Sequence, residues 1–335
     1  MTTLTDIREQ LTRLWQKKIL ILFGLLFLAS IVILGSWWWQ AHQPKPPFGL
    51  LVAPQIVEAD LGEGQSTLYL RISEADLKGL PREAPVYRVK IVAWDETERE
   101  LIAQRFGFKG KGEKAFDAFG NEACVWADPP QILSITPYGR LSFSASTGAV
   151  RIEKAPKNVT EAAALAESLI NKYSLSAVNL GAKKVVLIQV PGEGTGWEVS
   201  DWEKATYIEV GWSGEVGSYQ LFHDGYGESY LFIRLAKDGS LLQLEFLTTE
   251  VEESENYLLK SVKEIKNALA AGEGKLVYVE GNTQPKSIFL TGAKLALFQE
   301  SNKEYLQPIF VFEGKSGDGK AFVLFLPAVS SKWMK

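Results

Sequence analysis

TEAAALAESLINKY, residues 160–173, predicts an amphipathic helix placed directly before a run of strands. Thr160 is a suitable N-cap, and the apolar residues recur at the spacing of one helical face. These apolar residues are Ala163, Leu165, Ala166, Leu169 and Ile170. β-branched and aromatic residues then predict strands at 184–190, 205–212, 230–236 and 241–249. A helix that buries its apolar face on a small antiparallel sheet makes an α+β unit.

The same order of elements recurs toward the C-terminus. A second helix is expected over residues 256–270, before further strands at 275–280, 294–299, 307–313 and 320–326. A weaker version begins near Thr97. We therefore predict repeated helix-on-sheet units, with a domain boundary near Pro156. The predicted domains are residues 51–155 and 156–335, the latter divided into units 156–250 and 251–335.

A helix with A-x-x-x-A spacing before a hairpin, as in residues 160–173, resembles the plan of PepSY-like domains. The C-terminal segments YLQPIFVFEG (305–314) and FVLFLPAV (322–329) resemble the closing hairpin of YycH/YycI-type proteins. That resemblance implies a single-pass bacterial membrane protein whose outer domains are PepSY-like. It also implies a role in restraining or tuning a membrane sensor kinase.

ILILFGLLFLASIVILGSWWW, residues 19–39, contains no charged side chain and is long enough to span a bilayer core of about 30 Å. Trp37, Trp38 and Trp39 are expected at the membrane interface. Residues 1–18 form a predicted amphipathic segment with a net charge of +2, which places the N-terminus in the cytoplasm. The proline-rich residues 40–50 predict a linker, and the remainder is expected outside the plasma membrane.

The composition weakens most enzyme classes. The chain has 335 residues, one cysteine, two histidines and a net charge of −4. One cysteine excludes a disulfide within the chain, and so few sulfur and imidazole ligands argue against a structural zinc site. The acidic balance argues against nucleic acid as a partner. His223-Asp224 has no recognisable nucleophile beside it, so we predict no cofactor, no metal and no catalysis.

A glycine-rich stretch rich in aromatic residues, 213–229, predicts a long connection between strands, and long loops often carry function. The candidate binding residues in and beside it are Trp212, Tyr219, Phe222, Tyr226 and Tyr230. These rings could contact a protein partner or a glycan, or they could fill the core beneath the sheet. We predict a non-catalytic, membrane-anchored envelope protein that acts by binding a membrane or envelope protein, for example by regulating a membrane sensor kinase or protease. The alternative is a module that binds cell-wall glycan or peptide.

Two further features of the sequence are an acidic run and the single cysteine. The acidic run Glu250, Glu252, Glu253 and Glu255 lacks the order of a calcium loop and is expected on a solvated face at the start of the second helix. Cys124 lies in the apolar stretch ACVW and is expected to be a buried thiol.

Overall fold

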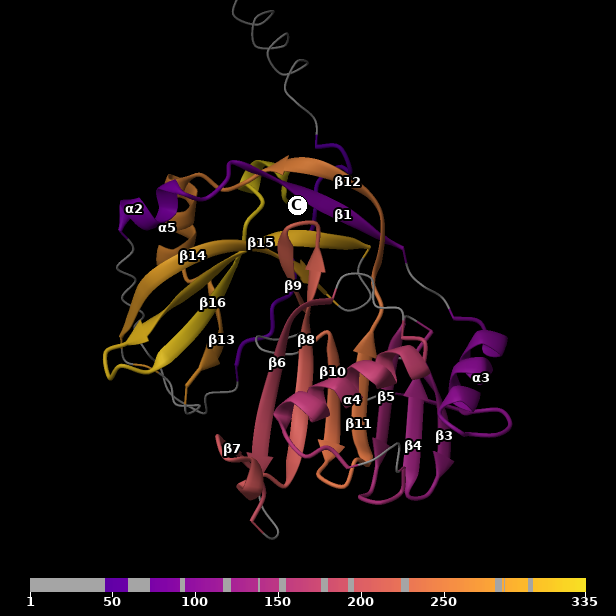
Figure 1. Ribbon diagram of the computed structural model, residues 1–335. Coiled ribbons are helices and arrows are strands. Elements are labelled where there is room, and N and C mark those ends of the chain that lie inside the picture. Colours follow the sequence, from indigo (N-terminus) through magenta and orange to yellow (C-terminus); the bar gives the residue numbers. More distant parts are fainter. Residues whose placement is uncertain are drawn as a thin grey trace, which may run out of the picture. The chain divides into compact units, whose positions relative to one another are not determined.

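The computed structural model describes residues 46–59, 73–90, 94–116, 122–137, 139–150, 155–175, 180–191, 196–223, 229–280, 285, 287–300 and 304–335. Residues 50–335 form one compact unit, separate from residues 1–49 (Figure 1). Segments 1–18 and 19–39, with Trp37, Trp38 and Trp39, lie outside the described residues. Within the described part of the chain, no helix is long and apolar enough to cross a membrane.

The compact unit is a mixed α and β fold dominated by one large sheet. Its first part is an antiparallel run in the order β6-β8-β10-β11-β5-β4-β3-β2. The strands are β2 (Glu113–Phe116), β3 (Glu122–Asp128), β4 (Gln131–Ile135), β5 (Arg140–Ala145), β6 (Leu180–Gln189), β8 (Tyr207–Val216), β10 (Leu231–Ala236) and β11 (Leu241–Leu247). The short β7 (Trp197–Val199) pairs with β6 and precedes a 3-10 turn at Trp202–Lys204.

Helix α4 (Val159–Lys172) lies across this run, and α3 (Glu96–Arg105) lies beside β3 (Figure 1). The apolar face predicted for α4 is buried, with Leu165, Ala166 and Leu169 packed in the same core as Ile208 and Ile233 of the sheet. The helix begins one residue earlier than predicted. Asn158, rather than Thr160, is its N-cap and accepts a hydrogen bond from the Glu161 backbone N–H at 2.9 Å.

The C-terminal strands form a second antiparallel group in the order β13-β16-β15-β14. Helix α5 (Val262–Ala270) and the short α2 (Glu74–Lys78) share a hydrophobic core with these strands. The strands are β13 (Lys275–Val279), β14 (Ile288–Gln299), β15 (Tyr305–Ser316) and β16 (Ala321–Pro327). Strand β1 (Glu83–Lys90) joins β15 to the edge strand β12 (Glu250–Leu258). A 3-10 turn at Ser331–Trp333 closes the chain.

Two strand pairings cross the boundaries of the predicted domains. β5 pairs with β11, and their residues share one core, so the boundary expected near Pro156 does not separate two sheets. Strand β9 (Tyr219–His223) runs parallel to β14 and connects the two strand groups. A core shared across a sequence boundary cannot divide into independent domains, which corrects the division into residues 51–155 and 156–335.

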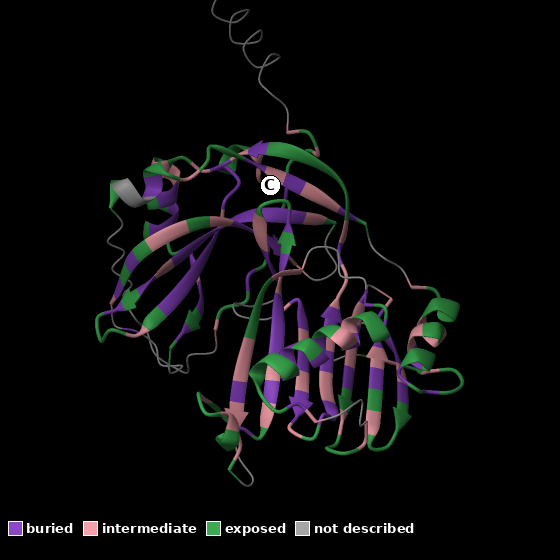
Figure 2. Ribbon diagram, viewed as in Figure 1, coloured by how far each residue is buried: buried purple, intermediate pink, exposed green. Residues whose placement is uncertain are grey.

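The second predicted helix is partly wrong. Residues 256–258 belong to β12, and the helix begins at Val262, where Ser261 and Glu264 form a capping box. The acidic run therefore lies on an exposed edge strand (Figure 2) rather than on a helix. The strand pairs antiparallel with β1 along its length, and two ion pairs accompany the pairing: Glu253 contacts Arg88, and Glu250 accepts from Lys90 Nζ at 2.9 Å.

Candidate functional site

The aromatic residues predicted as a binding loop lie mainly in strands. Trp212 is in β8, and Phe222 is in β9 with its ring 5.0 Å from that of Phe325. Trp212, Phe222 and Tyr230 are all buried. Tyr219 is half-buried in β9, and Tyr226 lies outside the described residues. The described rings therefore fill the core, which was the alternative left open for them, and only Tyr219 retains partial exposure.

Two glycines of this stretch are explained by backbone conformation and by close packing. Gly217 adopts a φ of +62° at the turn between β8 and β9, a conformation that favours glycine. A Cβ on Gly214 would lie 2.8 Å from the ring of Tyr230, so this position needs a residue without a side chain. The prediction of a long connection over 213–229 is thus wrong where the structure describes it, because residues 213–216 and 219–223 belong to β8 and β9 and glycine permits a tight turn and close packing.

The other candidate chemistry is sparse. His223 is buried, and its Nε2 lies 3.3 Å from the Ser229 carbonyl oxygen, while Asp224 lies outside the described residues. Cys124 is buried, as predicted. Among the described residues, no three His, Cys, Asp or Glu side chains gather where they could hold a metal ion.

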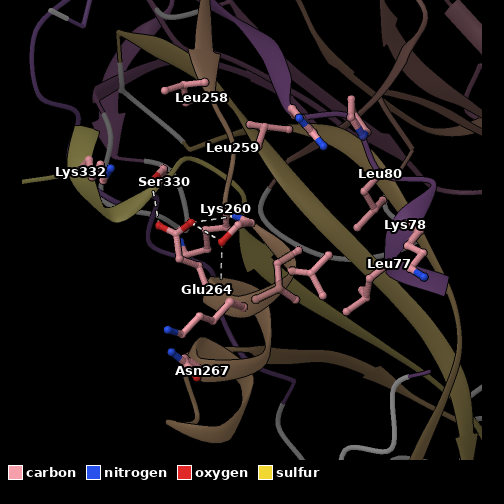
Figure 3. Close-up of a pocket in the computed structure, with 16 residues that line it drawn as sticks. Leu77, Lys78, Leu80, Leu258, Leu259, Lys260, Glu264, Asn267, Ser330 and Lys332 are labelled. Carbon is pink, nitrogen blue, oxygen red and sulfur yellow. Dashed lines mark hydrogen bonds between the residues drawn. The ribbon is translucent and has the colours of Figure 1, made fainter. Parts of the chain in front are cut away.

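A more distinctive feature is a pocket of about 970 Å³ that opens where α2, β12 and the start of α5 meet (Figure 3). Its apolar floor is formed by Leu77, Leu259 and Ile265, all of them buried. Leu80 and Val262, partly exposed, extend that apolar surface toward the mouth. Ser330 and Lys332, from the C-terminal segment, complete the wall. We call it the cationic pocket, for the charges described next.

Five cations and one carboxylate line this pocket. The cations are Lys78, Arg82, Lys260, Lys263 and Lys332, and the carboxylate is Glu264. In the part of the chain that the structure describes, none of the four exposed cations forms an ion pair. By contrast, Lys266 on the same helix as Lys263 pairs with Glu74 at 3.0 Å. Unpaired charges of one sign around a concave surface attract ligands of the opposite sign.

The two partly buried charges of the pocket, Lys260 and Glu264, form hydrogen bonds with neighbouring groups of the protein. Lys260 Nζ donates to the carbonyl oxygens of Pro327 at 2.8 Å and Val329 at 3.1 Å, and burial lowers the pKa of Lys260. Glu264 accepts from Ser261 and Ser330, both at 2.8 Å (Figure 3). Partial burial raises the pKa of Glu264, but these hydrogen bonds outweigh it and lower the value to about 2. Glu264 is therefore ionised at neutral pH, but its oxygens are bound to serine groups, and among the described residues it forms no ion pair with the exposed cations.

Sequence reasoning missed this pocket. Its cations come from three segments, 78–82, 260–263 and 332, that lie far apart in the chain. Each cation alone is an ordinary surface lysine or arginine. The one local signal is the capping box at Ser261 and Glu264, which predicts where the helix starts but says nothing of a cavity.

Comparisons with known proteins assign no family. No protein-family model and no curated protein matches the chain. Among solved structures, an uncharacterized protein from Eubacterium rectale ATCC 33656 matches with a TM-score of 0.44 and 10% identity. The match covers 73% of this chain and 82% of that protein. We draw no function from a likeness at this level.

Proposed function

We propose that the chain is a membrane-anchored, non-catalytic envelope protein that acts by binding an acidic segment of a protein partner in the cationic pocket. Residues 19–39 would be the anchor, and residues 50–335 the extracytoplasmic part. The four exposed cations without ion-pair partners carry this proposal. The resemblance to YycH/YycI-type proteins makes a membrane sensor kinase or protease a reasonable class of partner.

The pocket favours a peptide over a simple anion. Its floor is built from leucine and isoleucine side chains, and its rim from lysine and arginine. A segment that alternates acidic with apolar residues would pair with the rim and bury its apolar side chains on the floor. Burying apolar surface adds about 25 cal/mol per Å² to such a contact. A free phosphate or carboxylate would use the rim alone.

The location of the pocket favours a partner close to the membrane. Lys332 on the pocket wall lies two residues before Met334, which forms a bridge with Leu51. Leu51 directly follows the predicted linker, residues 40–50. Eleven residues span at most about 36–40 Å. If residues 19–39 cross the bilayer, the pocket is therefore within reach of the juxtamembrane segment of a neighbouring membrane protein.

Site-specific photo-crosslinking tests this function. A photoreactive phenylalanine at Leu80, on the apolar part of the pocket, is compared with the same residue at Leu101, an exposed leucine on α3. In the native cells we expect a protein adduct at Leu80 alone, joined to an acidic segment of a membrane or envelope protein. Adducts only with lipid or wall glycan, or the same adducts at both positions, would contradict the proposal.

A charge test uses two lysines of one helix. Lys263 lines the pocket and is unpaired, whereas Lys266 is paired with Glu74 outside it. A fluorescent peptide of alternating glutamate and leucine should bind the full-length chain in detergent, measured by anisotropy. Lys263→Gln should weaken binding about fivefold, which is roughly one charge-assisted contact, while Lys266→Gln leaves it unchanged. Equal effects of the two changes would mean that the peptide senses only the overall charge.

A further inference from the structure

The sheet face opposite α4 carries a second pocket, of about 550 Å³. Successive side chains of a strand point to opposite faces. Ile208 and Val210 of β8 face the core beneath α4, so Glu209 and Gly211 face the other way. The pocket lies over β6, β8, β10 and β11, and its volume is in the range of sites for small molecules.

Strand register arranges the lining side chains in two rows. The first row crosses three strands, with Glu209 beside Arg234 and Arg234 beside Gln243. In the second row Gly211 lies between Lys184 and Phe232, and Glu245 follows Phe232. These polar groups are therefore held on paired strands rather than on loops, which fixes their spacing.

Contacts among the side chains hold the first row rigid. Arg234 donates to Glu209 Oε1 from Nε at 3.0 Å and from Nη2 at 2.7 Å, and its guanidinium lies 4.7 Å from the ring of Tyr207 and 5.4 Å from that of Phe232. The two side chains are 31% and 21% exposed, the least exposed ion pair among the described residues. An arginine fixed in this way keeps its orientation when a ligand arrives.

The second row provides a polar edge to the pocket. Gly211 lies between Lys184 and Phe232, and the Ser229 hydroxyl occupies the space above it, where an added Cβ would collide. Gln243 Nε2 donates to Glu245 Oε1 at 2.7 Å. Side chains that include both donors and acceptors thus line the pocket beside the half-exposed ring of Phe232.

We propose that this pocket binds a neutral saccharide. Its three cations, Arg140, Lys184 and Arg234, are nearly balanced by Glu209 and Glu245, unlike the charges of the cationic pocket. A pocket whose charges nearly balance attracts an anion only weakly, whereas a lining with both donors and acceptors matches the hydroxyl groups of a sugar. The Phe232 ring supplies the apolar surface on which the C–H face of a sugar ring stacks.

The test uses three neutral tetrasaccharides, namely cellotetraose, chitotetraose and maltotetraose. The full-length chain is kept in lauryldimethylamine oxide, because the sugar headgroup of a maltoside detergent would compete. Saturation-transfer NMR reports which sugar protons contact the protein, and titration gives the affinity. We expect saturable binding of at least one tetrasaccharide, with the strongest transfer to the C–H protons of one ring face.

Two variants and a control decide the site. Phe232→Leu removes the ring, and Arg234→Lys removes the forked donor but keeps its charge. Each should weaken binding about fivefold or more. Glu313→Gln breaks an ion pair of similar length, 2.7 Å to Lys294, outside the pocket and should leave binding unchanged. No saturable binding, binding only to an acidic oligosaccharide, or equal affinity in Phe232→Leu would overturn the proposal, provided the variants keep the melting temperature of the parent.

Discussion

At the scale of single residues, Glu264 binds the C-terminal segment to the start of α5 through hydrogen bonds. One carboxylate oxygen accepts from Ser261, and the other accepts from Ser330 at 2.8 Å and Ser331 at 3.3 Å. Glu264→Gln keeps the shape but replaces one acceptor with a donor. We expect the free energy of unfolding at pH 7 to fall by about 1–3 kcal/mol, measured by urea denaturation. Glu273→Gln, on the exposed turn after α5, should change it little.

The same carboxylate predicts a pH dependence. The pKa of Glu264 falls from its ordinary 4.5 to about 2 in the folded chain. A group with a depressed folded pKa stabilises the fold above its unfolded value, and this contribution is lost as the pH falls toward the folded value. The difference in unfolding free energy between the parent and Glu264→Gln should therefore be constant from pH 7 to about 5 and shrink between pH 4.5 and 2. A difference that stays constant down to pH 2.5 would show that the carboxylate is not specifically stabilised.

At the scale of elements, the β8–β9 hairpin gives opposite expectations for two of its rings. Phe222 is buried against Phe325 where β9 meets β14, whereas Tyr219 at the start of β9 is half-buried. Phe222→Ala should lower the free energy of unfolding by about 3–5 kcal/mol. Tyr219→Ala should lower it by less than about 1 kcal/mol, since it creates no enclosed cavity. Similar losses in both variants, measured by chemical denaturation, would mean that Tyr219 is also part of the core.

Hairpins and helices with local signals could be predicted from the sequence. Asp238-Gly239 is a sequence typical of tight hairpin turns and lies between β10 and β11, where Gly239 has a φ of +85°. The alanine and leucine pattern predicted α4. Strand β12 could not be predicted in this way. Its acidic residues resemble the start of a helix, and only β1, with Lys90 pairing to Glu250 across 160 positions, makes them a strand.

The candidate sites could not be predicted from the sequence for the same reason, because they depend on contacts between distant segments. The aromatic residues at 212–230 indicated burial or binding equally well, because the same rings serve either role. Both pockets are assembled from segments that the fold brings together, so their charge balance exists only in three dimensions. The net charge of a stretch of sequence does not show which charged side chains the fold brings together.

At the scale of the whole molecule, residues 50–335 form one compact unit, and among its described residues no three His, Cys, Asp or Glu side chains gather where they could hold a metal ion. Cys124 is buried and is the single cysteine of the chain. A truncated chain beginning at Phe48 should therefore unfold in one cooperative transition, and dithiothreitol or EGTA should leave its melting temperature unchanged. A lower melting temperature in EGTA would indicate a calcium site among acidic residues, with the edge strand β12 as the first place to look.

The predicted topology determines which side of the membrane both pockets face. Arg8, Arg13, Lys17 and Lys18 precede the apolar residues 19–39, and only Lys45 follows closely, so the positive-inside rule keeps the N-terminus in the cytoplasm. A membrane-impermeant amine reagent added to intact cells should then label exposed lysines of residues 53–335, such as Lys266 and Lys294, and spare Lys17 and Lys18. Permeabilised cells, in which all of these lysines react, provide the control.

Labelling of Lys17 and Lys18 alone in intact cells would reverse the orientation. The partner of the cationic pocket and the saccharide of the second pocket would then have to be sought in the cytoplasm.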